Sequence, residues 1–256
     1  MKEYIPSLNG LRAISIFFVL FAHVLLKNFN FSENPGGQIG VNIFFVISGY
    51  LITLLLLREE ENNGFISLKN FFIRRTIRIF PIYYILLLVY LILEIAGILR
   101  FSTNSWIASI TYTKYFLHEK NGDWESGHLW SLSIEEHFYL IWPLVFKILK
   151  NYRIHFAFLV IIVVTTIRLT TDISVMHIVT RADALLWGCV FAIFNNQIVD
   201  FFKSRNRLVA LVPFLTLLSV LAFKRVFTLM KVDHFENYVT AFLGSYGLVT
   251  NICIGC

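Results

Sequence analysis

Long apolar runs recur along the chain, and they constrain its fold more than any other feature. A helix needs about 20 mostly apolar residues to cross a bilayer. Hydrophobic residues make up 57% of the sequence and charged residues 15%, against about a quarter charged in soluble domains. The composition therefore predicts an all-α, polytopic membrane protein with a single integral-membrane domain over residues 1–256. The predicted spans are 11–29, 39–57, 79–99, 128–149, 154–169, 184–199, 208–224 and 238–256.

Basic residues predict the orientation of these spans. The densest basic loop, Arg58–Arg78, is expected in the cytoplasm, because lysine and arginine are enriched in cytoplasmic loops. This places the amino-terminus inside and the polar stretch Arg100–Gly127 outside. Basic loops at the membrane face then explain the net charge of +6, and no nucleic-acid partner is needed. Cys189, Cys253 and Cys256 lie in apolar segments, and we interpret them as buried small hydrophobic residues.

Arg12 and His23 are two ionisable residues of the first predicted span, eleven positions apart. Eleven helical residues extend about 16 Å, so Arg12 is expected at one interface and His23 in the distal half of the span. Ionisable groups at membrane depth are costly and typically functional, and imidazole suits proton transfer near neutral pH. The pair therefore predicts proton chemistry inside the membrane.

Polar residues also mark the second and third predicted spans. Asn42 is an amide at the outer end of its span, where it either bonds to another helix or contributes to a site. Arg75 and Arg78 stand at i and i+3 before the third span, so they share a face if the segment is helical. Two guanidiniums so placed suit phosphate or pyrophosphate, and anchoring to lipid headgroups is the alternative.

The fourth span is preceded by an unusually polar stretch that contains His128, Trp130, Ser131, Glu135 and Glu136. In a helix, His128, Ser131 and Glu135 fall on one face. Because this face leads directly into an apolar span, we expect it to line the bundle interior as part of a site. A serine–glutamate helix cap is the alternative interpretation.

Arg181 and Asp183 begin the sixth predicted span. They are two positions apart and do not share a helical face, so a direct pair within the helix is not expected. Both are candidates for a cavity mouth, and a favourable contact of Asp183 with the helix dipole is the simpler interpretation.

Together these segments resemble the acyltransferase-3 family of bacterial membrane acyltransferases, which includes O-antigen and other surface-glycan O-acetylases. Arg12-x10-His23 is similar to the family's basic-x10-His motif, and Arg75-x-x-Arg78 to its Arg-x-x-Arg motif. Three longer stretches are similar to the family patterns GVDIFFVISGFLI, HxWSLSVEEQFYLIWP and RxDALxxG; they are Gly40–Thr53, His128–Pro143 and Arg181–Gly188.

The resemblance implies transfer of an acyl group, usually acetyl, from cytoplasmic acetyl-CoA or another acyl-CoA to a hydroxyl of an extracytoplasmic glycan, such as lipopolysaccharide, or of a lipid-linked saccharide. The partners are then acyl-CoA, the acceptor and the lipid bilayer of the bacterial cytoplasmic membrane, and no metal is expected. His23 would be the base, assisted by Arg12, while Arg75 and Arg78 would bind the CoA phosphates. Ser131 and Glu135 join the predicted catalytic group. The predicted substrate-cavity residues are Asn42, His128, Trp130, Glu136, Arg181 and Asp183.

Two departures from the family pattern matter. Asn42 stands where the family most often has an acid, which argues against proton transfer at that position. The family usually has about ten spans, whereas this chain ends at Cys256 within the eighth, so a C-terminally incomplete domain is expected. The alternatives to an active acyltransferase are a proton-coupled transporter, because intramembrane ionisable groups also suit proton relays, and an inactive truncated product.

Overall fold

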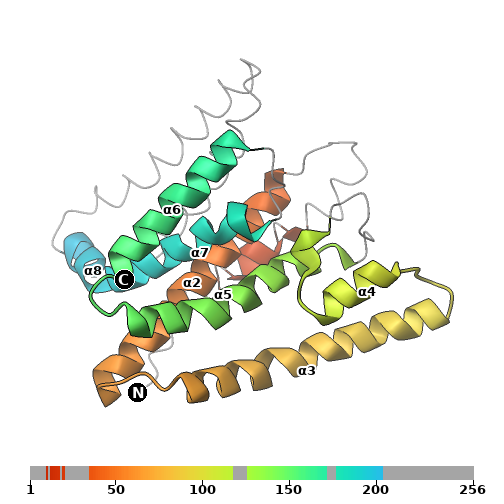
Figure 1. Cartoon of the computed structure of the whole chain (residues 1–256), viewed down its shortest axis with the longest axis horizontal. Coiled ribbons are helices and arrows are strands. Elements are labelled where there is room, and N and C mark those ends of the chain that lie inside the picture. The colour runs from red at the N-terminus through yellow and green to blue at the C-terminus, as the bar shows by residue number, and fades with distance from the viewer. Residues whose placement is uncertain are drawn as a thin grey trace. The chain divides into compact units, whose positions relative to one another are not determined.

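The computed structural model of the chain describes residues 10–20 (11 and 18 excepted), 35–117, 126–171 and 177–203. Within these ranges every regular element is a helix, as predicted (Figure 1). His23 and the predicted spans 208–224 and 238–256 lie outside the described residues. The helices are α2 (Pro35–Asn63), α3 (Leu68–Ile95), α4 (Thr103–Ile110), the 3-10 helix η2 (Lys114–Phe116), α5 (Leu129–Ile148), α6 (Arg153–Thr170), α7 (Ile178–Ile193) and α8 (Asn195–Lys203).

Two helices of the described chain are long and apolar enough to cross a membrane, Gly40–Asn63 of α2 and the whole of α3. They overlap the second and third predicted spans, 39–57 and 79–99, but α3 begins eleven residues before its predicted span. The total of eight spans stays a prediction. Soluble monomers rarely expose a large continuous apolar patch, so we expect lipid against the exposed face of α3. The side chains of α3 that are more than half exposed include Ile77, Ile82, Ile85, Leu88, Ile92 and Ile95.

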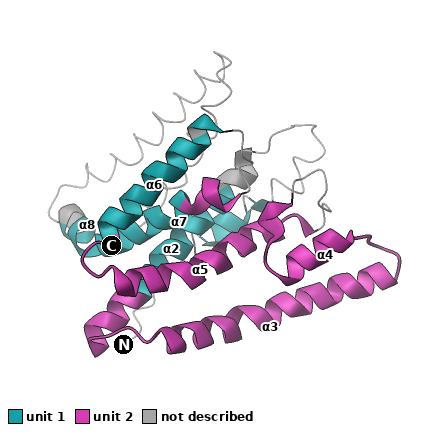
Figure 2. Cartoon of the chain, in the orientation of Figure 1, with its two compact units in different colours: residues 1–55, 154–171, 183–256 teal, residues 56–153, 172–182 magenta. Residues whose placement is uncertain are grey.

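The chain divides into two compact units (Figure 2). The first comprises the described parts of residues 1–55, 154–171 and 183–256, and the second those of 56–153 and 172–182. In the first unit, α2 and α7 approach each other at glycines. A Cβ on Gly49 would lie 1.9 Å from the carbonyl oxygen of Leu185, and one on Gly188 would lie 2.0 Å from that of Val46. Small residues allow such close backbone approach.

In the second unit, the segment predicted as an external stretch forms α4 and η2 and returns along α3 (Figure 1). The hydroxyl of Tyr83 donates to the carbonyl of Ser109 at 2.6 Å. The indole Nε1 of Trp106 donates to Glu94 Oε2, also at 2.6 Å. Both bonds join α4 to α3, because buried polar groups of neighbouring elements satisfy one another. The consequence is that the residues after α4 lie beside the middle of α3.

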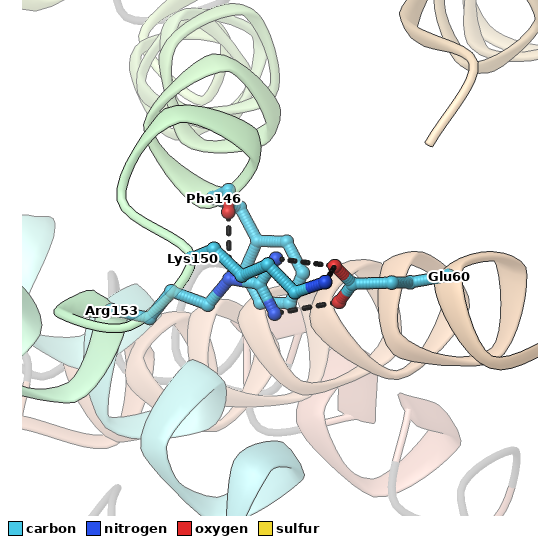
Figure 3. Close-up of polar contacts among 4 residues, drawn as sticks. All are labelled: Glu60, Phe146, Lys150 and Arg153. Carbon is cyan, nitrogen blue, oxygen red and sulfur yellow. Dashed lines mark hydrogen bonds and ion pairs between the residues drawn. The ribbon is translucent and has the colours of Figure 1, made fainter. Parts of the chain in front are cut away.

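A mostly buried ion pair fixes the end of α2 to the turn between α5 and α6 (Figure 3). Arg153 donates to both carboxylate oxygens of Glu60, at 2.7 and 3.0 Å. Its Nε donates to the carbonyl of Phe146 at 2.6 Å, and its guanidinium carbon lies 3.7 Å from the centroid of the Phe146 ring. Lys150 adds an ion pair to Glu60 at 3.5 Å. Bidentate arginine–carboxylate pairs fix geometry as well as charge, so this contact orients both helix ends in the second unit.

Candidate active site

One cavity of about 150 Å³ lies in the second unit, between α3, the turn after α4 and α5. A water molecule needs about 10–15 Å³ of such space, so this cavity holds several waters or a small organic group. Its walls carry a guanidinium, a carboxylate, an imidazole and two phenols. The lining residues are Phe72, Arg75, Thr76 and Phe80 from α3, Thr111 and Tyr112 from the turn, and Glu136, His137, Tyr139 and Leu140 from α5.

Arg75 supplies the positive charge of the cavity. Its guanidinium carbon lies 4.2 Å from the centroid of the Tyr139 ring, a distance typical of a cation–π contact. In the described part of the chain no carboxylate lies within ion-pair distance of Arg75, whereas the adjacent Arg74 pairs with Glu59 at 2.9 Å. The N–H donors of Arg75 therefore remain for an anion or a carbonyl oxygen. Arg78, predicted to act with Arg75, is exposed and does not line the cavity.

Glu136 supplies the carboxyl group of the cavity. Its Oε1 is buried, and among the described residues it has no hydrogen-bond partner. Buried polar atoms in proteins are nearly always bonded to protein or ordered water, so such an oxygen in a cavity wall marks a position for a ligand or water. The adjacent Glu135, which is predicted to belong to the catalytic group, is buried and does not line the cavity.

Tyr112 lies just after the C-terminal end of α4, at a position that is usually glycine. The N–H groups of Tyr112 and Thr113 donate to the carbonyls of Ser109 and Ala108, which is the bonding pattern of a Schellman motif. Tyr112 takes the left-handed position of this motif, with φ +57°, where a non-glycine residue costs about 1–2 kcal/mol. Strained residues of this kind cluster at functional sites.

Packing holds the Tyr112 side chain in place. Its ring stacks on Tyr83, with 4.3 Å between centroids, and on Phe80, with 5.6 Å. Its hydroxyl is buried and has no hydrogen-bond partner among the described residues. Burial raises the pKa of the Tyr112 hydroxyl above its ordinary value, so the phenol stays protonated. Tyr112 is therefore a rigidly held hydrogen-bond donor in the cavity wall.

His137 follows Glu136 and is held on two sides. Its Nδ1 lies 2.8 Å from the carbonyl oxygen of Ser133, one helical turn earlier. Its ring forms a T-shaped pair with the ring of Tyr115, with 5.3 Å between centroids, and His177 forms a second T-shaped pair with Tyr115 at 5.5 Å. The cavity thus combines groups that accept protons with groups that donate hydrogen bonds, which general acid–base chemistry at a carbonyl requires.

The predicted polar face of α5 differs from the face that lines the cavity. His128 is the N-cap residue, and its Nε2 lies 3.4 Å from the Tyr90 hydroxyl. Ser131 donates from Oγ to the carbonyl of His128 at 3.1 Å, and Ser133 donates to that of Leu129 at 2.9 Å. Both serines therefore lie inside the helix, so the helix-cap interpretation of this stretch is wrong.

The other predicted site residues are not among those that line the cavity. Asp183 lies in the second turn of α7, not at its start, and accepts a bond from Arg168 at 2.6 Å. A buried ion pair thus replaces the expected helix-dipole contact. The remaining residues are Arg12 and Trp130, which are half-buried, and Asn42 and Arg181, which are buried. Their predicted roles stay predictions, as does that of His23.

Sequence reasoning missed Tyr112, His137 and Tyr139 as site residues. His137 and Tyr139 belong to the polar stretch predicted as a site. Each residue turns the side chain by about 100° around the helix axis, so His137 lies on a different face from His128, Ser131 and Glu135. Only the contacts with α3 show which of these faces is used. No local pattern around Tyr112 indicates a site, because its position depends on α4 folding back along α3.

Comparison with known proteins decides the family. The model of the acyltransferase-3 family, an acyltransferase domain, matches residues 5–253. The chain belongs to the acyltransferase-3 family. This membership favours the predicted enzyme over the alternative of a transporter.

Part of the chain is similar to O-acetyltransferases and putative O-acetyltransferases of other bacteria. The chain is 42% identical over 166 residues to the peptidoglycan O-acetyltransferase OatA of Listeria monocytogenes, covering 59% of this chain and 26% of the relative. It is 40% identical over 174 residues to a putative O-acetyltransferase of Staphylococcus aureus, covering 61% and 28%. It is 38% identical over 154 residues to the putative peptidoglycan O-acetyltransferase YrhL of Bacillus subtilis, covering 56% and 24%. The matches thus span about a quarter of these relatives. No solved structure matches the chain.

Proposed function

We propose that this acyltransferase-3 protein transfers an acetyl group from acetyl-CoA to a hydroxyl of a cell-wall glycan at the bacterial cytoplasmic membrane. The names of its relatives favour peptidoglycan as the acceptor over the lipopolysaccharide expected from the sequence. The observation that carries the proposal is that Arg75 and Glu136, from two motifs far apart in the sequence, line one cavity. The exposed apolar face of α3 supports the membrane location.

The cavity groups fit the chemistry of this transfer. The acceptor oxygen attacks the thioester carbonyl carbon, a C–O bond forms, the C–S bond breaks, and the hydroxyl proton finally reaches the CoA thiolate. Arg75 and Tyr112 donate hydrogen bonds to the carbonyl oxygen as negative charge develops on it. The free Oε1 of Glu136 accepts a hydrogen bond from the attacking hydroxyl and orients it. His23 is the base that the family resemblance suggests.

The volume of the cavity limits which part of the donor it receives. At about 150 Å³ it takes the acetyl-thioester end, while the rest of CoA extends outside. Arg78, exposed one turn after Arg75, is then available to the phosphates, which arginine binds in a bidentate manner. The predicted cytoplasmic position of this loop agrees with a cytoplasmic donor.

The test compares Arg75→Ala with Arg74→Ala in membrane vesicles given acetyl-CoA and glycan acceptor. Arg74 is the matched control, because its exposed pair with Glu59 lies outside the cavity and such pairs contribute about 0–1 kcal/mol. O-acetyl groups on the glycan are measured by mass spectrometry, and released CoA by a thiol reagent. We expect Arg75→Ala to lose at least about 100-fold in rate, the scale of one lost oxyanion donor. Absence of transfer by the unmodified chain, or equal rates in the two variants, would contradict the proposal.

Sealed vesicles test the side of the donor. Acetyl-CoA supplied only at the face that was cytoplasmic is expected to support acetylation of acceptor at the opposite face. Acetylation that depends on acetyl-CoA at the external face would contradict the cytoplasmic donor while leaving the reaction itself in place.

A further inference from the structure

A small hollow, separate from the cavity, lies in the second unit between the C-terminal half of α3, helix α4 and the residues just before α5. Its volume of about 10 Å³ is the space of a single water molecule. It therefore holds one hydroxyl group, and any larger ligand must lie across its rim. Its walls combine three aromatic rings, those of Tyr90, Phe101 and Trp106, with three serine side chains, those of Ser105, Ser109 and Ser126.

The three rings form an aromatic rim, and each of them is half-buried. The ring of Phe101 lies 5.4 Å from that of Tyr90 and 5.6 Å from that of Trp106, measured between centroids. Glu94 holds two of these residues in place. Its Oε2 accepts from the indole of Trp106 at 2.6 Å, and its Oε1 accepts from the backbone N–H of Phe101 at 3.0 Å. The aromatic rim is therefore a fixed surface that solvent partly reaches.

Buried serine hydroxyls and an ammonium group form the polar part of the hollow. Lys114 is buried, and its Nζ donates to Oγ of Ser105 and to Oγ of Ser126, the latter at 2.7 Å. Ser109 donates from Oγ to the carbonyl of Ser105 at 2.8 Å. The hydroxyl oxygens are thus held in fixed positions. A hydroxyl group both donates and accepts hydrogen bonds, so three of them suit a hydroxyl of a ligand.

This combination fits a sugar better than a lipid. A sugar presents hydroxyl groups at its edge and C–H groups on its faces, and C–H groups pack on the electron-rich face of an aromatic ring. A lipid chain offers nothing to the serine hydroxyls. Tryptophan and tyrosine also gather at membrane interfaces, where the polar tip of the ring meets the headgroups. The indole N–H of Trp106, however, is bonded to Glu94 within the protein.

We propose that the hollow and its aromatic rim bind a sugar of the acceptor glycan. This inference rests on the proposed function and names where the acceptor is held. Phe80, in the wall of the cavity assigned to the acyl group, and Leu87, in the wall of the hollow, are seven residues apart on α3, which is about 10 Å. Neighbouring sugars of one glycan can therefore lie at the hollow and at the cavity. Most residues of the hollow belong to the predicted external stretch Arg100–Gly127, in agreement with an extracytoplasmic acceptor.

The kinetic test compares Phe101→Ala with Phe116→Ala in the full chain, in membrane vesicles given acetyl-CoA and glycan. Phe101→Ala removes one ring of the rim and keeps the backbone bond to Glu94. Phe116 is the matched control, because it is an exposed aromatic residue of the same external stretch and does not line the hollow. We expect Phe101→Ala to raise the KM for the glycan by about 10-fold, the scale of an aromatic residue central to an interface, with the KM for acetyl-CoA unchanged.

Two results of this comparison would overturn the inference and leave the proposed function standing. One is an equal KM for the glycan in the two variants. The other is a lower amount of Phe101→Ala protein in the membrane with a normal KM for the glycan, which would identify the rings as membrane anchors.

A second measurement does not depend on turnover. The full chain in lipid nanodiscs, which lack the sugar headgroup of maltoside detergents, is titrated with chitin tetrasaccharide while tryptophan emission is recorded. We expect a saturable change that is lost in Trp106→Phe, which keeps an aromatic ring at this position, and a Kd about 10-fold weaker in Phe101→Ala. No change in the unmodified chain, or the same change in Trp106→Phe, would overturn the inference. Binding of the tetrasaccharide without any acetyl transfer would support the site and contradict the proposed function.

Discussion

Replacing Tyr112 by phenylalanine should make the protein no less stable and much less active. The substitution keeps the ring that stacks on Tyr83 and Phe80, and it keeps the backbone at φ +57°. It removes only a hydroxyl that is buried and has no hydrogen-bond partner among the described residues. Because no native hydrogen bond of that hydroxyl is lost there, the folded state gives up little, while the proposed reaction loses a donor to the carbonyl oxygen.

The magnitudes follow from these contacts. Burying an unsatisfied polar group costs about 1–3 kcal/mol, so the free energy of unfolding of Tyr112→Phe should be unchanged or higher by up to about 2 kcal/mol. The missing donor should lower the rate of acetyl transfer by about 100-fold. Tyr83→Phe is the matched control, because Tyr83 is stacked on the same ring but donates to the carbonyl of Ser109 at 2.6 Å. That variant should lose about 1 kcal/mol and keep its activity.

We would measure the thermal unfolding of both variants in detergent and their acetyl transfer in vesicles. We expect Tyr112→Phe to be the more stable of the two variants and Tyr83→Phe to be the more active. If Tyr112→Phe were destabilised by more than Tyr83→Phe, its hydroxyl would have a structural partner. If it transferred acetyl at the normal rate, the phenol would have no part in the reaction, and the assignment of Tyr112 would be refuted.

Three further predictions concern the ion pair of Glu60 with Arg153, the size of the cavity, and the glycine contact between α2 and α7. Glu60→Gln leaves the buried Arg153 without its counter-charge and should destabilise the protein by about 3 kcal/mol, seen as a lower unfolding temperature; a change within error would show the pair to be unimportant. Phe72→Ala enlarges the cavity and should raise the rate with butyryl-CoA relative to acetyl-CoA; an unchanged ratio would place the acyl group elsewhere. Gly188→Ala puts a methyl group 2.0 Å from the Val46 carbonyl oxygen and should sharply reduce folded protein in the membrane, whereas a normal yield would contradict the close packing.

The helical class and the family follow from the sequence, because both depend on local patterns. Apolar runs of span length require helices in a bilayer, and α2 and α3 fall on two of the predicted spans. The glycine contact of Gly49 with α7 is likewise typical of small residues in packed helices. The motif containing Arg75 is also predicted to belong to a site, and Arg75 lines the cavity of the second unit.

The face of α5 that serves the site does not follow from the sequence. Glu135 and Glu136 are adjacent and chemically identical, and the periodicity of the stretch is satisfied by either one. The choice is made by long-range packing, since α4 turns back along α3 and places Tyr112 opposite Glu136 and His137. The return of α4 depends on hydrogen bonds between segments far apart in the chain, and no local pattern encodes them.

The most direct test of the account is the acetyl-transfer rate of Glu136→Gln, with Glu61→Gln as the matched control. Both substitutions replace one carboxyl group by an amide, but Glu61 is exposed and does not line the cavity. Glycan O-acetylation is measured by mass spectrometry at equal amounts of membrane-inserted protein. We expect Glu136→Gln, which lacks the carboxyl group that orients the attacking hydroxyl, to be about 100-fold slower, while Glu61→Gln transfers acetyl at the normal rate. Normal transfer by Glu136→Gln would contradict the placement of the reaction in this cavity.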